Sequence, residues 1–301
     1  MKTADVLCAK SPVLVRSRMA DYVELSKPRI SIMVLVTVAA GALMATSGPV
    51  DWAGLCQTLI GTALVAAGAS ALNQFLERDS DALMRRTESR PLPSGRLQPF
   101  EVAIFGAAFG LVGVLYLALA GQRMAAAVAA TTFLVYVFVY TPLKRVTTLN
   151  TLIGAVPGAL PPVIGWVSVR GTIDAQIVIV FLILFLWQVP HFLAIAWIYK
   201  RDYAQAGMCM LPVVDDSGAI TGRQMVCYCL ALLSASLLPL SNGRAGVLYL
   251  AGAMLLGALF LTCALAFAQR PGLDRARSVV RASLVYLPLL LALLLLDGSP
   301  H

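Results

Sequence analysis

Nine apolar runs, each long enough to cross a lipid bilayer, constrain this chain more than any other feature. A bilayer core of about 30 Å needs about 20 apolar residues in a helix, and only helices or closed barrels satisfy their backbone hydrogen bonds in lipid. The runs are Ile30–Ser47, Trp52–Phe75, Glu101–Ala120, Arg123–Tyr140, Leu149–Val169, Ala175–Tyr199, Met225–Leu240, Gly246–Phe267 and Val279–Leu296. The sequence therefore predicts an all-α, polytopic membrane protein with about nine transmembrane helices in a bundle around a central cavity.

The composition leaves little of the chain outside the membrane. Hydrophobic residues make up 59% of the 301 residues and charged residues only 13%, which is far from the balance of a soluble domain. We expect a basic N-terminal segment, residues 1–29, followed by a single transmembrane domain, residues 30–301. The N-terminal segment lacks the apolar stretch of a secretory signal peptide. Small residues in "GTALVAAGASA" and "GAAFGLVG" favour close packing between helices.

Basic residues alternate cleanly between the two ends of the predicted helices. Of the 23 lysines and arginines, 20 fall at one end, and only Arg123, Arg170 and Arg244 fall at the other. Because lysine and arginine accumulate in short cytoplasmic loops, we expect a cytoplasmic N-terminus, an outside C-terminus and a cavity that opens to the cytoplasm. Topology accounts for the net charge of +8, so nucleic acid is not an expected partner.

The loop after the second run carries a stripe of oxygen ligands. In "NQFLERDSDALMRRTESRPLPSGRL", Asn73, Glu77 and Asp81 are spaced four residues apart, so they share one face if the helix continues past the membrane surface. Asp79 points elsewhere. Carboxylate and amide oxygens suit Mg²⁺, which typically takes one or two carboxylates and completes its shell with water and substrate phosphate. The spacing therefore predicts a magnesium site.

Four arginines follow these acids in the same loop: Arg85, Arg86, Arg90 and Arg96. Guanidinium groups match phosphate oxygens in shape and charge, which would suit a polyanionic substrate. The alternative is a solvated loop whose charges follow topology alone. That alternative explains the acids less well, because acidic residues contribute little to membrane orientation.

Two later segments carry further candidates for anion binding. Tyr140 and Lys144 are four residues apart at a cytoplasmic helix end, where they could present a hydroxyl and an ammonium to one phosphate group. Lys144 could equally snorkel toward the membrane interface. Lys200, Arg201 and Asp202 begin the charged loop that follows the sixth run.

Two features interrupt otherwise apolar runs. His191 lies within "WQVPHFLAIAWIYKRDY", eight residues before Tyr199, which is about 12 Å along a helix. Ionisable residues within membrane segments are usually functional, although a neutral histidine hydrogen-bonded to a neighbouring helix is the alternative. A proline cluster, Pro157, Pro161 and Pro162, interrupts the fifth run, which membrane helices tolerate where broken backbone faces protein or a cavity.

Three segments together resemble one known family. "NQFLERDSDALMRRTESRPLPSG", "YTPLKRVTTLNTLIGAVPGALPPVIGW" and "WQVPHFLAIAWIYKRDYAQAGMCMLPV" are similar to the signature regions of the protohaem IX farnesyltransferase (haem O synthase) family, a branch of the UbiA-type intramembrane prenyltransferases. The resemblance covers residues 26–214 and the helix count. It implies a helical enzyme of the cell inner membrane that transfers the farnesyl group of farnesyl diphosphate to a vinyl group of haem b, with water addition, giving haem O and diphosphate.

The resemblance also implies roles for individual residues. It places in catalysis Asn73, Glu77, Asp81 and Lys144. It places around Mg²⁺ the residues Asn73, Glu77, Asp79 and Asp81. It places against the diphosphate Arg85, Arg86, Arg90, Tyr140, Lys144, Lys200, Arg201 and Asp202. His191 would be an axial ligand of haem iron, as imidazole commonly is, so haem b is a substrate and not a cofactor. The next haem-modifying enzyme or the terminal oxidase assembly machinery would be a partner.

Two positions depart from the general superfamily pattern. Glu77 stands where the general motif has Asp, and "YKRDY" keeps Asp202 as its only acid, which puts a symmetrical two-metal site in doubt.

A prenyltransferase for an aromatic quinone precursor would share the diphosphate site without needing His191. A membrane transporter should instead carry ionisable residues or broken helices near the bilayer midplane.

Overall fold

The computed structural model describes residues 17–241, 243 and 245–297, and that part of the chain is helical without strands. Nine described helical segments are long and apolar enough to cross a membrane, which confirms the predicted all-α, polytopic architecture. Residues 1–16 of the expected N-terminal segment, and Arg244, lie outside the described residues.

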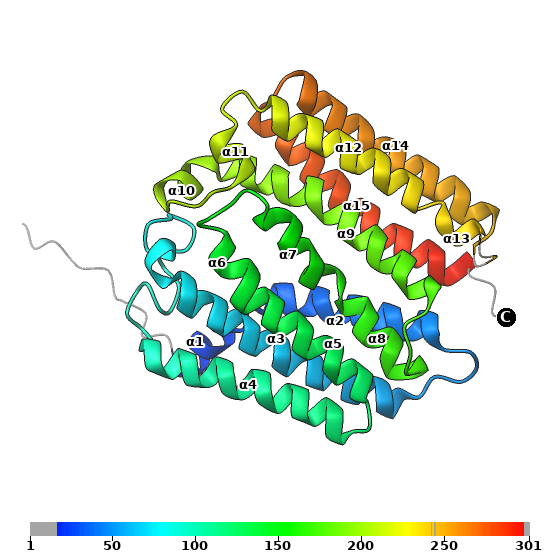
Figure 1. Cartoon of the computed structure of the whole chain (residues 1–301), viewed down its shortest axis with the longest axis horizontal. Coiled ribbons are helices and arrows are strands. Elements are labelled where there is room, and N and C mark those ends of the chain that lie inside the picture. Colours follow the sequence, from blue (N-terminus) through cyan, green and yellow to red (C-terminus); the bar gives the residue numbers. More distant parts are fainter. Residues whose placement is uncertain (1–16, 242, 244, 298–301) are drawn as a thin grey trace, which may run out of the picture.

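The nine spans run back and forth between the two ends of the molecule (Figure 1). They are α2 (Pro28–Ala45), α3 (Trp52–Asp81), α4 (Pro99–Leu119), α5 with η1 and α6 (Arg123–Leu143), α7 with α8 (Asn150–Arg170), α9 (Ala175–Ile198), α12 with α13 (Ala219–Ser241), α14 (Val247–Gln269) and α15 (Leu273–Asp297). The composite spans divide into α5 (Arg123–Leu134), the π-helix η1 (Val135–Tyr140), α6 (Thr141–Leu143), α7 (Asn150–Ala159), α8 (Pro161–Arg170), α12 (Ala219–Ala235) and α13 (Leu238–Ser241).

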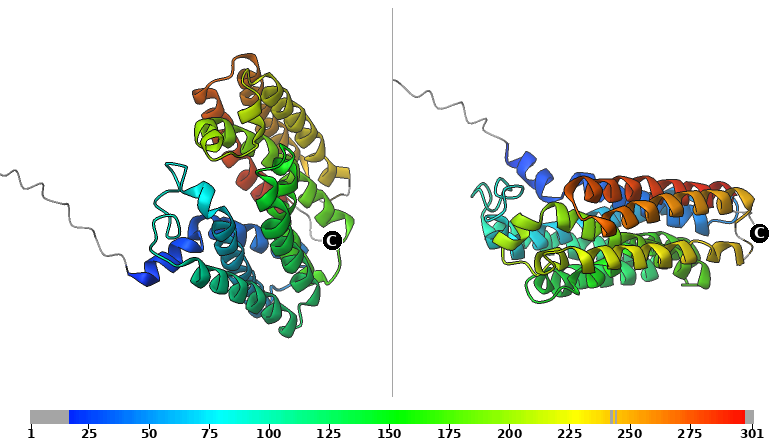
Figure 2. Two further views of the ribbon diagram at one scale, coloured as in Figure 1. Left: turned by 60° about the vertical axis from the view of Figure 1, so that its left-hand side comes forward. Right: turned by 90° about the horizontal axis from the view of Figure 1, so that it is seen from above.

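Three spans extend well beyond their predicted bounds at the same end of the bundle. The second continues through α3 to Asp81, the seventh begins at Ala219 and the ninth begins at Leu273. These added turns carry polar and charged residues, which apolarity alone does not detect. The short helices α1 (Arg18–Leu25), α10 (Lys200–Gln205) and α11 (Leu211–Val214) gather at this end too, opposite the end of α15 (Figure 2).

The spans form two groups that meet along α9. Helices α2 to α8 make one group, and α12, α14 and α15 make the other (Figure 1). α9 packs against α7 and α8 on one side and against α12 and α15 on the other. It is therefore the element through which the two groups contact each other most directly.

Glycines allow the tightest helix crossings in the first group. A Cβ atom added to Gly68 of α3 would lie 2.5 Å from the backbone nitrogen of Gly110 in α4. A Cβ atom on Gly165 of α8 would lie 1.9 Å from the carbonyl oxygen of Val38 in α2. Neither position has room for a side chain, so glycine is what allows these helix backbones to come so close in lipid. The Gly68 crossing confirms the packing expected from the two small-residue stretches.

The fifth span is broken where the prolines predict. α7 ends at Ala159 and α8 begins at Pro161, because proline lacks the N–H that would continue the ladder. On α9, the Gln188 side-chain amide donates to the carbonyl oxygen of Ala155 over 3.3 Å. The Ala155 carbonyl oxygen beside the irregular turn thus has a hydrogen-bond partner within the protein, as membrane segments require.

Candidate active site

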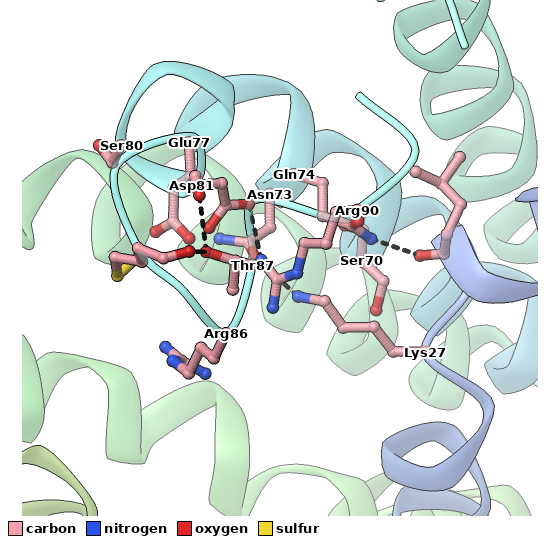
Figure 3. A network of polar contacts seen from close by, with 12 residues as sticks. Lys27, Ser70, Asn73, Gln74, Glu77, Ser80, Asp81, Arg86, Thr87 and Arg90 are labelled. Carbon is pink, nitrogen blue, oxygen red and sulfur yellow. Dashed lines mark hydrogen bonds and ion pairs between the residues drawn. The ribbon is translucent and has the colours of Figure 1, made fainter. Parts of the chain in front are cut away.

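Three oxygen ligands lie together on one buried face near the end of α3. Asn73, Glu77 and Asp81 are 1%, 6% and 1% exposed and follow one another along the helix (Figure 3). The structure does not bring Asp79 to this cluster. Its side chain is 75% exposed beside Arg78, because a residue two positions from Glu77 and from Asp81 points to another side of an α-helix.

Lys27, which the sequence analysis did not single out, meets the first of these ligands. Its Nζ donates to Oδ1 of Asn73 over 2.8 Å, and the amide of Asn73 donates to Thr141 Oγ1 over 3.1 Å. Lys27 joins α1 to α2 with a left-handed φ of 49°, a conformation seldom adopted without glycine and often found at functional sites. Burial, reinforced by the Arg90 guanidinium, lowers the pKa of Lys27 to about 7.

Lys144 meets the second ligand. Its Nζ lies 2.6 Å from Oε1 of Glu77 and 4.6 Å from the ring centroid of Tyr140. Burial opposes the charge of Lys144, yet the Glu77 carboxylate outweighs it and holds the pKa of Lys144 above its ordinary value. Tyr140 lies over Gly154 of α7, where a Cβ atom would be 2.4 Å from its ring. Lys144 therefore remains a cation and points inward, which disfavours the snorkelling alternative.

Arg90 meets the third ligand. Its Nη1 lies 2.6 Å from Oδ2 of Asp81, and the Thr87 hydroxyl donates to the Asp81 carbonyl oxygen over 2.8 Å, so the loop folds back over the helix end (Figure 3). The other carboxylate oxygen, Oδ1, is buried without a hydrogen-bond partner among the described residues. A buried carboxylate oxygen left unpaired is costly, so Oδ1 is suited to a cation or to a bound ligand.

The oxygen donors fit a Mg²⁺ site in which water and substrate phosphate complete the coordination shell. Within residues 17–241, 243 and 245–297, no group of three or more His, Cys, Asp and Glu side chains could hold a metal ion by protein ligands alone. Glu77 and Asp81 supply two carboxylates, Asn73 supplies an amide, and Asp81 Oδ1 is unpaired. Mg²⁺ commonly takes one or two carboxylates and fills its remaining positions with water and phosphate.

The remaining arginines of the loop have different surroundings. Arg86 lies over the rings of Tyr199 and Tyr203, at 5.1 and 5.3 Å, and donates to the Tyr203 hydroxyl over 3.0 Å. Arg85 is exposed. Arg145, another residue that sequence reasoning missed, donates to the hydroxyl of Ser80. Arg86 thus joins the loop to α10. Among Arg85, Arg86 and Arg90, only Arg90 pairs with an acid of the α3 cluster.

His191 lies deeper in the bundle, on α9. Its Nδ1 is 2.7 Å from the Ser283 hydroxyl on α15, and its ring stacks on Trp187 with 5.1 Å between centroids. The residue is half-buried. The hydrogen bond to a neighbouring helix that the non-functional alternative predicts is therefore present. It uses only one of the two ring nitrogens.

The family follows from comparison with known proteins. The model of the UbiA prenyltransferase family matches residues 34–293. The chain belongs to the UbiA prenyltransferase family. Among its relatives, the protoheme IX farnesyltransferase of Solibacter usitatus is 45% identical over 93% of this chain and 99% of its own. That of Koribacter versatilis is 41% identical over 95% of each chain.

Solved structures of UbiA proteins share the fold. A structure of digeranylgeranylglyceryl phosphate synthase superposes with a TM-score of 0.79 at 18% identity, covering 93% of this chain and 98% of that one. A UbiA homologue from Archaeoglobus fulgidus bound to DMAPP and Mg²⁺ superposes with a TM-score of 0.64 at 15% identity, covering 91% and 99%. These likenesses confirm the all-helical architecture, and the family makes this chain a multi-pass membrane prenyltransferase.

In this UbiA prenyltransferase the second charged loop is built differently from the end of α3. Lys200 pairs with Asp216 over 2.9 Å, and Asp216 is 97% exposed. Arg201 is exposed and Asp202 is half-buried. Within the described residues, no hydrogen bond or ion pair joins Lys200, Arg201 or Asp202 to the Asn73, Glu77 and Asp81 cluster. The structure thus gathers Asn73, Glu77 and Asp81 into one cluster. The charged residues at the start of α10 lie outside that cluster.

Proposed function

We propose that this prenyltransferase transfers the farnesyl group of farnesyl diphosphate to a vinyl group of haem b, with addition of water, giving haem O and diphosphate. The observation that carries the proposal is a buried cluster of three oxygen ligands at one end of the bundle, each in contact with a lysine or arginine side chain, together with His191 deeper in the bundle. The name protoheme IX farnesyltransferase, borne by relatives over nearly their whole length, supports this donor and this acceptor.

The polar cluster binds the leaving group. Asn73, Glu77 and Asp81 would hold Mg²⁺ together with the diphosphate, and the bound metal makes diphosphate a better leaving group. Lys27, Arg90 and Lys144 surround the same place and stabilise the negative charge that develops on the diphosphate oxygens. On this proposal the contacts with these lysine and arginine side chains hold Asn73, Glu77 and Asp81 in place until the anion and metal arrive.

The acceptor lies deeper, where water is scarce. As the bond between farnesyl C1 and diphosphate oxygen breaks, a vinyl carbon of haem b bonds to C1. Water then adds to the resulting cation and loses a proton, which yields the hydroxyl group of haem O. His191, about 12 Å from the helix end by the rise of an α-helix, is the proposed axial ligand that sets the depth of the haem.

We also propose how the protein is oriented in the membrane and where its product goes. The site end carries nearly all basic residues, so we place it in the cytoplasm, with the N-terminus inside, the C-terminus outside and the chain in the cell inner membrane as one transmembrane domain over residues 30–301. Haem O is too apolar to leave through water, so the next haem-modifying enzyme or the terminal oxidase assembly machinery is its expected recipient.

Incubation of the purified full-length protein in nanodiscs with haem b, farnesyl diphosphate and Mg²⁺ tests the reaction. We expect mass spectrometry to show haem that has gained one farnesyl group and one hydroxyl group, and no product when EDTA is added or farnesyl diphosphate is left out. In a parallel incubation with a hydroxybenzoate or a naphthoate added, prenylation of that ring beside unmodified haem would favour the quinone-precursor alternative. For the same protein reconstituted in sealed vesicles, substrate uptake without any product would favour a transporter.

The haem position has a separate test. We expect His191→Ala to insert and fold as the wild type does, but to change the absorption spectrum of bound ferric haem, because the axial imidazole is lost. An unchanged spectrum would remove His191 from its proposed role, while leaving the transfer reaction open to the mass analysis above.

A further inference from the structure

We propose that Ser283 holds the imidazole of His191 in the tautomer with its proton on Nδ1, so that Nε2 is unprotonated and open as the nitrogen that binds iron. The tautomer is a property of the protein itself. Only the identity of the group that Nε2 binds rests on the proposed function.

The proton assignment follows from the hydrogen bonds of one hydroxyl. Ser283 Oγ lies 2.7 Å from the carbonyl oxygen of Val280 and 2.7 Å from Nδ1 of His191. A carbonyl oxygen only accepts, and a hydroxyl has a single hydrogen. The Ser283 hydrogen therefore goes to Val280, and the bond to His191 needs a hydrogen on Nδ1.

The other nitrogen is then free to act as a ligand. A neutral imidazole with its proton on Nδ1 keeps a lone pair on Nε2, the form that binds metals. No hydrogen bond to Nε2 occurs within the described part of the chain, and the half-buried ring is not fully enclosed. Metal-binding histidines commonly use the second nitrogen as a donor in this way, which orients the ring and fixes its tautomer.

Trp187 makes the arrangement rigid. Its indole N–H donates to the Ser283 carbonyl oxygen over 2.8 Å, while its ring stacks on His191 at an interplanar angle of 17°. Ser283 is fully buried, at 0% exposure. One residue of α15 is thus bound through its backbone and its side chain to two residues of α9, one turn apart, and the imidazole has little freedom to rotate. Ser283 and Trp187 are positioning residues for His191.

Nitrogen NMR of the haem-free protein tests the tautomer directly. The chain has two histidines, so His301→Gln in a full-length protein purified without a histidine tag leaves every ¹⁵N-histidine signal to His191. We expect the Nδ1 resonance of a protonated nitrogen and the Nε2 resonance of an unprotonated one. The reverse pattern would overturn the proposal.

Removal of the hydroxyl tests the cause. With Ser283→Ala we expect a mixture of tautomers and an apparent Kd for ferric haem b raised about tenfold, the usual scale for losing a group that orients a metal ligand. Ser278→Ala is the matched control, because the Ser278 hydroxyl also donates to a carbonyl oxygen of its own helix, that of Asp274, but on an exposed surface. An unchanged tautomer in Ser283→Ala would refute the role of Ser283. A shifted tautomer with no haem ligation by wild-type His191 would instead refute the haem part of the proposed function.

Discussion

The end of α3 and the loop after α9 both bring charge to the same end of the bundle, yet they are built in opposite ways. At α3 the acids are buried and each reaches a cation, as Glu77 does with Lys144. After α9 the charges turn outward, as Lys200 does toward exposed Asp216. α3 is one helix of 30 residues that keeps its stripe in register, whereas α9 ends at Ile198 and Lys200 starts a new helix. Continuity of the helix decides which charges face inward.

The second loop instead covers the first. Met84, which lies just after α3, packs with Met208 and Met210 in one buried apolar cluster, and Arg86 lies over Tyr199 and Tyr203. Apolar and aromatic contacts therefore join the two loops where a symmetrical site would have placed a second set of metal ligands. We therefore expect the chemistry of the site to depend on α3 far more than on α10.

The largest effect is expected from Asp81→Asn. Loss of the carboxylate that pairs with Arg90 and has a free buried oxygen should lower kcat for haem O formation roughly 100- to 1,000-fold, without changing haem affinity. Asp79→Asn is the matched control on the same helix, and it should retain wild-type kcat because its side chain is exposed. Equal losses in the two variants would break the distinction between the buried and exposed faces of α3.

Lys27→Met should have the next largest effect. A hydrogen bond to a charged group is worth about 1.5–3 kcal/mol, so we expect kcat/KM for farnesyl diphosphate to fall roughly 10- to 100-fold. Arg29→Met, two residues away on the exposed side of α2, should change it little. A wild-type kcat/KM in Lys27→Met would show that the contact with Asn73 is structural only.

Arg86→Ala should have a moderate effect through the covering loop. Losing its two aromatic contacts should release the loop over residues 82–98 and lower kcat about fivefold, since cation–π contacts are worth about 0.5–2 kcal/mol. Hydrogen exchange followed by mass spectrometry should show faster exchange in that loop. Arg85→Ala, an exposed neighbour, should leave the exchange of this loop unchanged, and a similar acceleration there would contradict the assignment.

The smallest effect is expected from Asp202→Asn. Because Asp202 makes no ion pair among the described residues and lies apart from the Asn73, Glu77 and Asp81 cluster, kcat for haem O formation should stay within about twofold of wild type, as expected for a charge without a close partner. A loss as large as that of Asp81→Asn would mean that a second metal-binding half forms when substrate is bound, and it would remove the asymmetry between the two loops.

What the sequence determined by itself is local in origin. The nine spans follow from apolarity and length, the break between α7 and α8 follows from prolines, and the shared face of Asn73, Glu77 and Asp81 follows from the 3.6-residue turn. Even the exclusion of Asp79 from that face follows from helix geometry. Such features depend on neighbours within a few residues, so they can be predicted from the sequence directly.

Only the tertiary structure decided which distant groups meet. Lys27 and Asn73 are 46 residues apart, and His191 and Ser283 are 92 apart. No local pattern marks Lys27 as a partner of Asn73, or Ser283 as the acceptor that assigns a proton to His191. These pairings depend on how whole helices pack against one another across the bundle, which no single segment of the chain records.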